Sequence, residues 1–231
     1  MRIAVLHHHF LVIDELVEAP QFKLLYQSLR RAKYRTHAGW ASVWSLAEQG
    51  GYRCSPFTGD SIVRDGGNPA SVAYAIFAQA LDGILPELEY LTGRRGEDWT
   101  HFNGNAVMFP PGGALNWHTD KKYAASYSYY CQSEWQRRWG GELLVQEQEA
   151  PSWGRGAPEG TGAARAAGAK PEGEAVDDIG YYVAPIANRL VVVRGAIPHR
   201  IAAVSPAAGE NYRMSITGFF VAGEAGEDDE A

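Results

Sequence analysis

The chain has 231 residues, of which 45% are hydrophobic and 21% are charged, and such values are typical of one globular domain and exclude fibrous or wholly disordered proteins. A net charge of −6 excludes a protein that binds nucleic-acid phosphates through a general excess of Lys and Arg. No run approaches the roughly 20 apolar residues that cross a bilayer, and the first residues lack a signal peptide's apolar region. We therefore expect a cytoplasmic protein without nucleic-acid or membrane partners, whereas the oligomeric state is not predicted.

The N-terminal part, to about residue 95, is predicted to be mainly helical. An apolar, β-branched run at residues 3–13 indicates a strand, and Asp14 then stands where the N-cap of a helix would lie, with Arg30 and Arg31 in its last turn. A second helix is predicted over residues 68–90, ending at Gly93. Its apolar stripe is expected at these positions: Val72, Ile76, Ala80, Ile84 and Leu88.

Three successive histidines, His7, His8 and His9, lie within the first predicted strand. Because neighbouring side chains on a strand point to opposite faces, three in a row cannot bind one metal ion in regular geometry. We interpret them as structural residues, and we interpret the two cysteines, Cys54 and Cys131, as structural thiols.

Residues 35–67 form an irregular segment with scattered aromatic side chains, typical either of a binding wall or of a packed loop. Its aromatic residues are Trp40, Trp44, Tyr52 and Phe57. Arg53, Arg64 and Arg194 could meet an anionic substrate or could be surface charges.

The sequence after Trp99 changes to short β-like runs separated by Gly, Pro and Asn. The runs cover residues 105–109, 123–130, 142–145, 179–183, 189–193, 200–204 and 213–221. They predict a mainly β protein with flanking helices, whose core at about 96–221 is a double-stranded β-helix, or jelly roll. One domain over 1–231 is expected, with a flexible Gly/Ala/Pro-rich insertion at 147–178 and an acidic tail at 222–231.

Three short patterns carry candidate chemistry. His118 and Asp120 are two residues apart at a predicted strand end, so an imidazole and a carboxylate can reach one cation together. His199 begins a later strand, and Arg213 and Ser215 share one face of an otherwise apolar strand. Two histidines and one carboxylate are the ligand set of non-haem Fe(II) with open positions, and an Arg with a neighbouring hydroxyl suits a carboxylate.

Taken in order, four motifs carry a family resemblance: His118-Thr-Asp120, Gly140-Gly141-Glu142-Leu143, Pro198-His199 and Arg213-Met-Ser215. Residues 105–220 resemble the Fe(II)/2-oxoglutarate dioxygenases, most closely the prolyl 4-hydroxylase-like group. The resemblance implies that His118, Asp120 and His199 bind Fe(II). It also implies that Arg213 pairs with the distal carboxylate of 2-oxoglutarate, assisted by Ser215.

Two further site residues follow from the resemblance. Tyr130 takes the position of a tyrosine that contacts the same carboxylate, although a shift of one residue would exchange it with Tyr129. Asn105 takes the position of a 2-oxoglutarate contact in the nucleic-acid-demethylating branch, and could otherwise cap a turn. Phe109 and Phe219 depart from that branch, which disfavours base demethylation. The presence of Asp120 disfavours halogenation.

The resemblance implies an oxygenase that uses Fe(II), 2-oxoglutarate and O2 and releases succinate and CO2. Its expected reaction is hydroxylation of an sp3 C–H bond in a peptide or protein side chain, an amino acid or a natural-product intermediate. Desaturation, epoxidation and cyclisation remain open. The alternatives are a β-barrel protein that binds another metal and acts as a hydrolase, isomerase or sensor, and a binding module that has lost catalysis. The first gives Arg213 and Ser215 no task, and the second is disfavoured because all three metal ligands and the carboxylate clamp are present.

Overall fold

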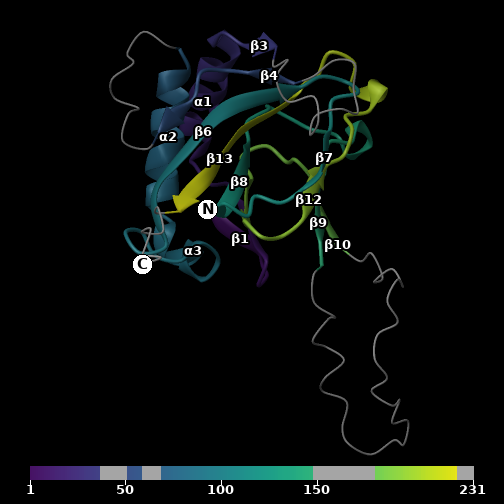
Figure 1. The fold of residues 1–231 in the computed structure, drawn as a ribbon. Coiled ribbons are helices and arrows are strands. Elements are labelled where there is room, and N and C mark those ends of the chain that lie inside the picture. The colour runs from purple at the N-terminus through teal and green to yellow at the C-terminus, as the bar shows by residue number, and fades with distance from the viewer. Residues whose placement is uncertain (37–50, 59–68, 148–179, 223–231) are drawn as a thin grey trace, which may run out of the picture.

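The computed structural model describes residues 1–36, 51–58, 69–147 and 180–222. Within these ranges the chain forms three layers: helices, a nine-stranded sheet and a four-stranded sheet (Figure 1). All strand pairs are antiparallel. The predicted mainly β architecture with flanking helices, a jelly roll, is therefore confirmed.

The nine-stranded sheet lies in the middle of the molecule. In spatial order its strands are β1 (Arg2–Leu6), β2 (Phe10–Asp14), β11 (Leu190–Arg194), β8 (Tyr123–Tyr130), β13 (Arg213–Ala222), β6 (Trp99–Phe109), β4 (Tyr52–Arg53) and β3 (Arg35–Thr36), with β5 (Phe57–Thr58) also beside β6. The four-stranded sheet has the order β10 (Gly180–Val183), β9 (Leu143–Gln146), β12 (His199–Ile201) and β7 (Leu115–His118).

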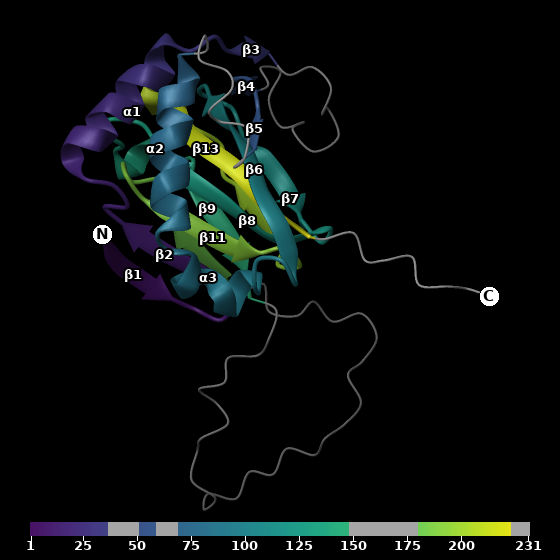
Figure 2. The ribbon, with the colours of Figure 1, turned by 90° about the vertical axis from the view of Figure 1, so that its left-hand side faces the viewer.

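The helices cover the face of the nine-stranded sheet that is turned away from the four-stranded sheet (Figure 2). They are α1 (Ala19–Arg31), α2 (Ala70–Asp82) and α3 (Leu85–Thr92). Two short 3-10 helices, η2 (Arg137–Trp139) and η4 (Pro206–Ala208), lie in the connections.

Strands β2 and β11 are apolar at almost every position because both of their faces are buried. On β2, Phe10 and Val12 belong to the core between the two sheets, whereas Leu11 and Ile13 belong to the core beneath the helices. Alternation along one strand thus serves two cores. The inter-sheet core is the one that surrounds the candidate site.

The N-terminal run folds differently from its prediction. It forms a hairpin of two strands, β1 and β2, and Asp14 ends the second strand instead of capping a helix. Glu15 follows in a left-handed conformation (φ 55°), and the helix begins only at Ala19, next to a proline. Asp14 instead forms ion pairs with Arg2 and Arg189. The predicted Arg30 and Arg31 do occupy the last turn of α1.

The single helix predicted over residues 68–90 is also wrong. Helix α2 ends before Gly83, and a separate helix, α3, begins at Leu85 with a proline in its first turn. The buried face of α2 is carried by Ala73, Tyr74 and Phe77, whereas Val72 is 47% exposed. Of the predicted stripe, Ile84 and Leu88 are buried. The predicted end at Gly93 is confirmed.

Several predictions fall outside the described residues: Trp40, Trp44, Arg64, the insertion at 147–178 apart from Glu147, and the tail at 222–231 apart from Ala222. Both cysteines are buried and unbridged. Among the helices of the described segments, none is long and apolar enough to cross a membrane.

Candidate functional site

His118, Asp120 and His199 come together between the two sheets. Strand β12 pairs with β7 so that His199 lies directly opposite His118, and Asp120 follows two residues after His118. The Nε2 atom of His199 is 3.3 Å from Asp120 Oδ2, and that of His118 is 3.9 Å from Oδ1. One ligand atom from each residue lies within 4.8 Å of the others. The three side chains could therefore hold one metal ion.

Hydrogen bonds to the backbone fix the orientation of both imidazoles. The Nδ1 atom of His118 is 2.8 Å from the carbonyl oxygen of Asn116, and that of His199 is 2.9 Å from the carbonyl oxygen of Ile197. A carbonyl oxygen can only accept, so each Nδ1 must carry the hydrogen. In a neutral ring the lone pair is then on Nε2, facing Asp120. Either a proton or a metal ion can lie between such a nitrogen and the carboxylate.

The pKa values of His118 and Asp120 are both lowered in the site. Burial lowers the pKa of His118, and the neighbouring His199 lowers it further. Burial alone would raise the pKa of Asp120, but hydrogen bonding and attraction from His199, together with Ser126 and His118, lower it below its ordinary value. Both groups therefore bind protons weakly, which leaves their ligand atoms available to a metal.

A close backbone turn holds the three residues in register. The amide of Asp120 donates to the carbonyl of Gly195 at 2.8 Å. A Cβ atom at Gly195 would lie 2.0 Å from the carbonyl oxygen of Tyr123 and 2.7 Å from that of Asp120. Only glycine permits this approach.

Arg213 is fully buried, with 0% exposure, at the start of β13. Its Nε donates to the carbonyl of Gly141 at 2.8 Å, and one terminal nitrogen donates to Ser215 Oγ at 3.3 Å. Among the described residues, the other terminal nitrogen has no hydrogen-bond partner. Burial lowers the pKa of this guanidinium, which Tyr130 and Glu142 oppose. A buried guanidinium with an unused donor is expensive unless an anion meets it.

Tyr130 lies beside this guanidinium, whose central carbon is 4.9 Å from the tyrosine ring centre. Its hydroxyl is buried and, in the described part of the chain, likewise has no hydrogen-bond partner. Tyr129 points the other way, into the core beneath the helices, where its hydroxyl donates to Asn188 at 2.7 Å. Of the two tyrosines, Tyr130 is therefore the one with an unused polar group next to Arg213.

The two glycines of the Gly140-Gly141 motif shape the turn beneath Arg213. Both have left-handed backbone angles, with φ 68° and 72°. A Cβ at Gly140 would lie 2.4 Å from the carbonyl oxygen of Ala203, and one at Gly141 would lie 3.0 Å from Arg213 Cδ. The turn thereby aims the Gly141 carbonyl at the arginine.

A cavity of about 110 Å³ contains the three candidate metal ligands. Arg53, Phe109, Ser126, Ser128, Thr217 and Phe219 also line it. Arg213 and Ser215 alternate along β13 with the same period as Thr217 and Phe219, and so they share the face that borders the cavity. Ser126 and Ser128 were not singled out from the sequence, although alternation with Tyr130 places them on the same face.

The other predicted residues lie in different surroundings. Asn105 is paired with Thr217 across β6 and β13. Tyr52 stacks on Tyr212, Phe57 is buried against Tyr74, and Arg194 donates to the carbonyl of Tyr90. Of the three arginines suggested for an anionic substrate, Arg53 borders the cavity and Arg194 does not.

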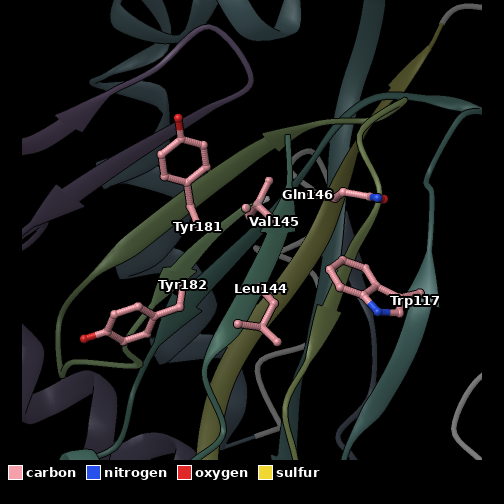
Figure 3. A pocket seen from close by; sticks show the side chains of 7 residues that line it. Trp117, Leu144, Val145, Gln146, Tyr181 and Tyr182 are labelled. Carbon is pink, nitrogen blue, oxygen red and sulfur yellow. The ribbon is translucent and has the colours of Figure 1, made fainter. Parts of the chain in front are cut away.

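A larger hollow of about 440 Å³ lies over β7, β9 and β10 (Figure 3). Its lining includes Trp117, Leu144, Gln146 and Tyr182, and Arg200 lies over the Trp117 ring at 5.3 Å. Among the described residues that line it, none is a His, Cys, Asp or Glu. The smaller cavity with the metal-ligating side chains is therefore the candidate active site.

Comparison with known proteins agrees with this geometry. Residues 102–221 match the family described as the 2OG-Fe(II) oxygenase superfamily. No curated protein matches the chain.

Two solved structures share the fold. A prolyl-4-hydroxylase from Pseudomonas putida is 18% identical, with a TM-score of 0.59, and the match covers 93% of this chain and 92% of that one. A prolyl hydroxylase from Trichoplax adhaerens, in complex with a hypoxia inducible factor peptide fragment, is 15% identical, with a TM-score of 0.60, covering 93% and 84%.

Proposed function

The chain belongs to the 2OG-Fe(II) oxygenase superfamily, and from this premise we propose that it hydroxylates an sp3 C–H bond with Fe(II), 2-oxoglutarate and O2. Succinate and CO2 are the expected co-products. The protein is an oxygenase by its family.

His118, Asp120 and His199 are the proposed ligands of Fe(II). Three protein ligands on one face leave further positions for a cosubstrate and O2. The bound iron would supply the oxygen chemistry, while the protein fixes the geometry and excludes competing reactions. The Asn116 and Ile197 carbonyls keep both Nε2 atoms directed at the metal position.

Arg213, Tyr130 and Ser215 are the proposed partners of the distal carboxylate of 2-oxoglutarate. The observation that carries this proposal is the buried, unused donor pair: one terminal nitrogen of Arg213 and the hydroxyl of Tyr130. Ser215 accepts from Arg213, so its own hydroxyl hydrogen remains available. A carboxylate would use all three donors. Asn105, on the neighbouring strand β6 of the same sheet, is proposed as an additional contact of 2-oxoglutarate.

The proposed substrates are a peptide or protein side chain, a free amino acid or a natural-product intermediate. A peptide is supported by the peptide fragment bound to the Trichoplax adhaerens relative. Arg53 at the cavity wall offers a cationic group to an acidic substrate. The alternative, a metalloprotein that is not an oxygenase, leaves the buried donors of Arg213 and Tyr130 without a purpose.

Anaerobic titration of the metal-free protein with Fe(II) and then 2-oxoglutarate tests both site assignments. Chelation of the iron should produce a visible charge-transfer band. We expect His118→Ala to abolish the band, and Ser215→Ala to require several-fold more 2-oxoglutarate for half-saturation. An undiminished band in the His118→Ala variant would refute the ligand assignment. Substrate screening can then follow succinate release.

A further inference from the structure

A second cluster of metal-ligating side chains lies outside the candidate active site. The Nε2 atoms of His7, His8 and His9 all face the carboxylate of Glu147, at 3.5, 3.6 and 3.1 Å. One ligand atom each from His7, His8 and Glu147 lies within 4.8 Å of the others. The Glu147 carboxylate is only 7% exposed, so the cluster is a buried anion surrounded by imidazoles.

The three histidines can converge because they are not part of a strand. Strand β1 ends at Leu6 and β2 begins at Phe10, so His7 to His9 form the connection of the hairpin. Side chains in this connection need not alternate between faces. The expectation that the three histidines lie within a strand is therefore wrong, and the alternation argument against a shared ion does not apply to them. Their rings are also close, with centres 4.1 Å apart for His7 and His8 and 3.9 Å apart for His8 and His9.

The nitrogen–oxygen distances are those expected between ligands of a tetrahedral ion. Zinc binds imidazole nitrogen and carboxylate oxygen at about 2.0–2.1 Å, which places two ligands of a tetrahedral ion about 3.3 Å apart. The nitrogen–oxygen distances in the cluster, 3.1–3.6 Å, span that value. Two or three imidazoles with one carboxylate are also a ligand set that zinc uses in proteins.

We propose that His7, His8 and Glu147, with His9 beside them, bind a Zn²⁺ ion at a site separate from the iron centre. Binding through Nε2 moves the proton of His7 to Nδ1, which ends the long 3.3 Å hydrogen bond from the His9 amide. Burial lowers the pKa of His7, assisted by His8, and this keeps the ring neutral as a ligand must be. Tyr181 points toward the hairpin (Figure 3), and its ring packs 4.7 Å from that of His7.

The position of this site gives the ion a structural task. The histidines connect β1 and β2 of the nine-stranded sheet, whereas Glu147 directly follows β9 of the four-stranded sheet. A shared ion thus ties the two sheets together across the inter-sheet core. Residues beside the proposed ligands hold the turn that precedes His199: the His9 carbonyl accepts from the Arg194 amide at 3.0 Å, and the amide of Gln146, next to Glu147, donates to the Pro198 carbonyl at 2.9 Å. Zinc at the cluster would therefore support the turn that carries one proposed iron ligand.

Calorimetric titration of the metal-free full chain with Zn²⁺ tests the site. The Asp120→Ala variant removes the carboxylate of the proposed iron centre, and we expect it to retain one Zn²⁺ site. Adding Glu147→Gln to that background should weaken the remaining binding at least 100-fold, because a neutral amide replaces the only anionic ligand. His8→Asn in the same background should weaken it comparably. His8 is exposed over half of its side chain, so this change leaves the core intact.

The matched control is His101→Ala, which removes an imidazole on β6 whose Nδ1 lies 2.9 Å from the Thr100 hydroxyl. It should change neither stoichiometry nor affinity. Substituting Co²⁺ should give the intense visible absorption of tetrahedral coordination, lost with Glu147→Gln. Absence of Zn²⁺ binding in Asp120→Ala, or unchanged binding after Glu147→Gln, would overturn the proposal. Neither result bears on the charge-transfer test of the iron site.

Discussion

At the scale of single residues, the candidate site is defined by polar groups that the apolar core leaves unused. Arg213 is as deeply buried as the phenylalanines around it, yet one of its terminal nitrogens has no hydrogen-bond partner among the described residues. The Tyr130 hydroxyl is also buried, and it too has no hydrogen-bond partner among the described residues. Two such groups side by side lower the stability of the protein without its ligand, and one bound anion could accept hydrogen bonds from both.

Tyr130→Phe tests this interpretation with the smallest possible change. Removing the hydroxyl takes away one hydrogen bond to a charged ligand, which is worth about 1.5–3 kcal/mol. We expect the KM or Kd for 2-oxoglutarate to rise about 10- to 100-fold, while Fe(II) affinity stays the same. Stability should not fall, because the hydroxyl has no partner within the described chain to lose.

Tyr129→Phe is the matched control on the opposite face of β8. Its hydroxyl donates to Asn188 Oδ1, which also accepts from the Val17 amide. This variant should lose about 1 kcal/mol of unfolding free energy and keep its affinity for 2-oxoglutarate. If Tyr129→Phe raises the KM and Tyr130→Phe does not, the assignment of the two tyrosines must be exchanged.

At the scale of elements, the long strands of the C-terminal half were predictable, whereas the short strands β3, β4 and β5 fall in a segment that was expected to be irregular. Alternation and turn residues located β8 and β13 almost to the residue, because each strand follows its own local pattern. The N-terminal hairpin was missed because its turn has no Gly, Pro or Asn, and is instead held by distant partners. The break at Gly83 was missed because the apolar spacing continues across it: Ile84 and Leu88 keep the four-residue interval of one helix and are both buried.

The site residues were easier to anticipate than the elements that carry them. A His-x-Asp pair, a later His and an Arg-x-Ser pair are visible in the sequence, and the structure brings the first three within 4.8 Å. Ser126 and Glu147 were not anticipated. Their neighbours come from strands far apart in the sequence, so no local spacing pointed to them.

Asp14 links three strands, and this link should depend on pH. Its carboxylate pairs with Arg189, just before β11, at 2.6 Å, and with Arg2 of β1 at 2.7 Å. Hydrogen bonding from Arg189 is the main cause that lowers the pKa of Asp14 below 3.8, against the opposing effect of burial. A lowered folded-state pKa contributes stability above the unfolded value and loses it as the pH falls through the folded value.

We therefore expect Asp14→Asn to lower the free energy of unfolding by about 2 kcal/mol between pH 5 and 7. The difference from wild type should shrink below pH 3.8, where the wild-type carboxylate also becomes protonated. Urea unfolding at pH 7, 5 and 3 measures this. Asp82→Asn removes the exposed ion pair between Asp82 and Arg95, whose charged atoms are 3.9 Å apart. This control should change the free energy of unfolding by less than about 0.5 kcal/mol at every pH. A difference that persists unchanged at pH 3 contradicts the role given to the Asp14 charge.

At the scale of the whole molecule, the candidate site lies where the two sheets face each other. One proposed iron ligand pair comes from β7 and its following turn, the other ligand from β12, and the anion clamp from β8 and β13 of the opposite sheet. The sheets are joined in this region mainly by the inter-sheet core, which includes Val107, Phe109 and Leu143. Ligands held by both sheets at once should therefore bind preferentially to the folded state.

The metal should accordingly stabilise the folded protein, and 2-oxoglutarate should stabilise it further once the metal is bound. With Mn²⁺ as a redox-stable substitute and both ligands at about 100 times their Kd, linkage predicts about 2.7 kcal/mol for each. A chain of this size gains about 2–4 °C in Tm per kcal/mol, so each ligand should raise Tm by about 5–10 °C. Because 2-oxoglutarate would bind both the metal and Arg213, its effect should be much smaller without Mn²⁺. Thermal unfolding of wild type and Asp120→Ala measures this dependence. The variant should lose most of the rise in Tm that the two ligands cause together. An equal rise in Tm with 2-oxoglutarate in both proteins would mean that the anion clamp acts independently of the metal.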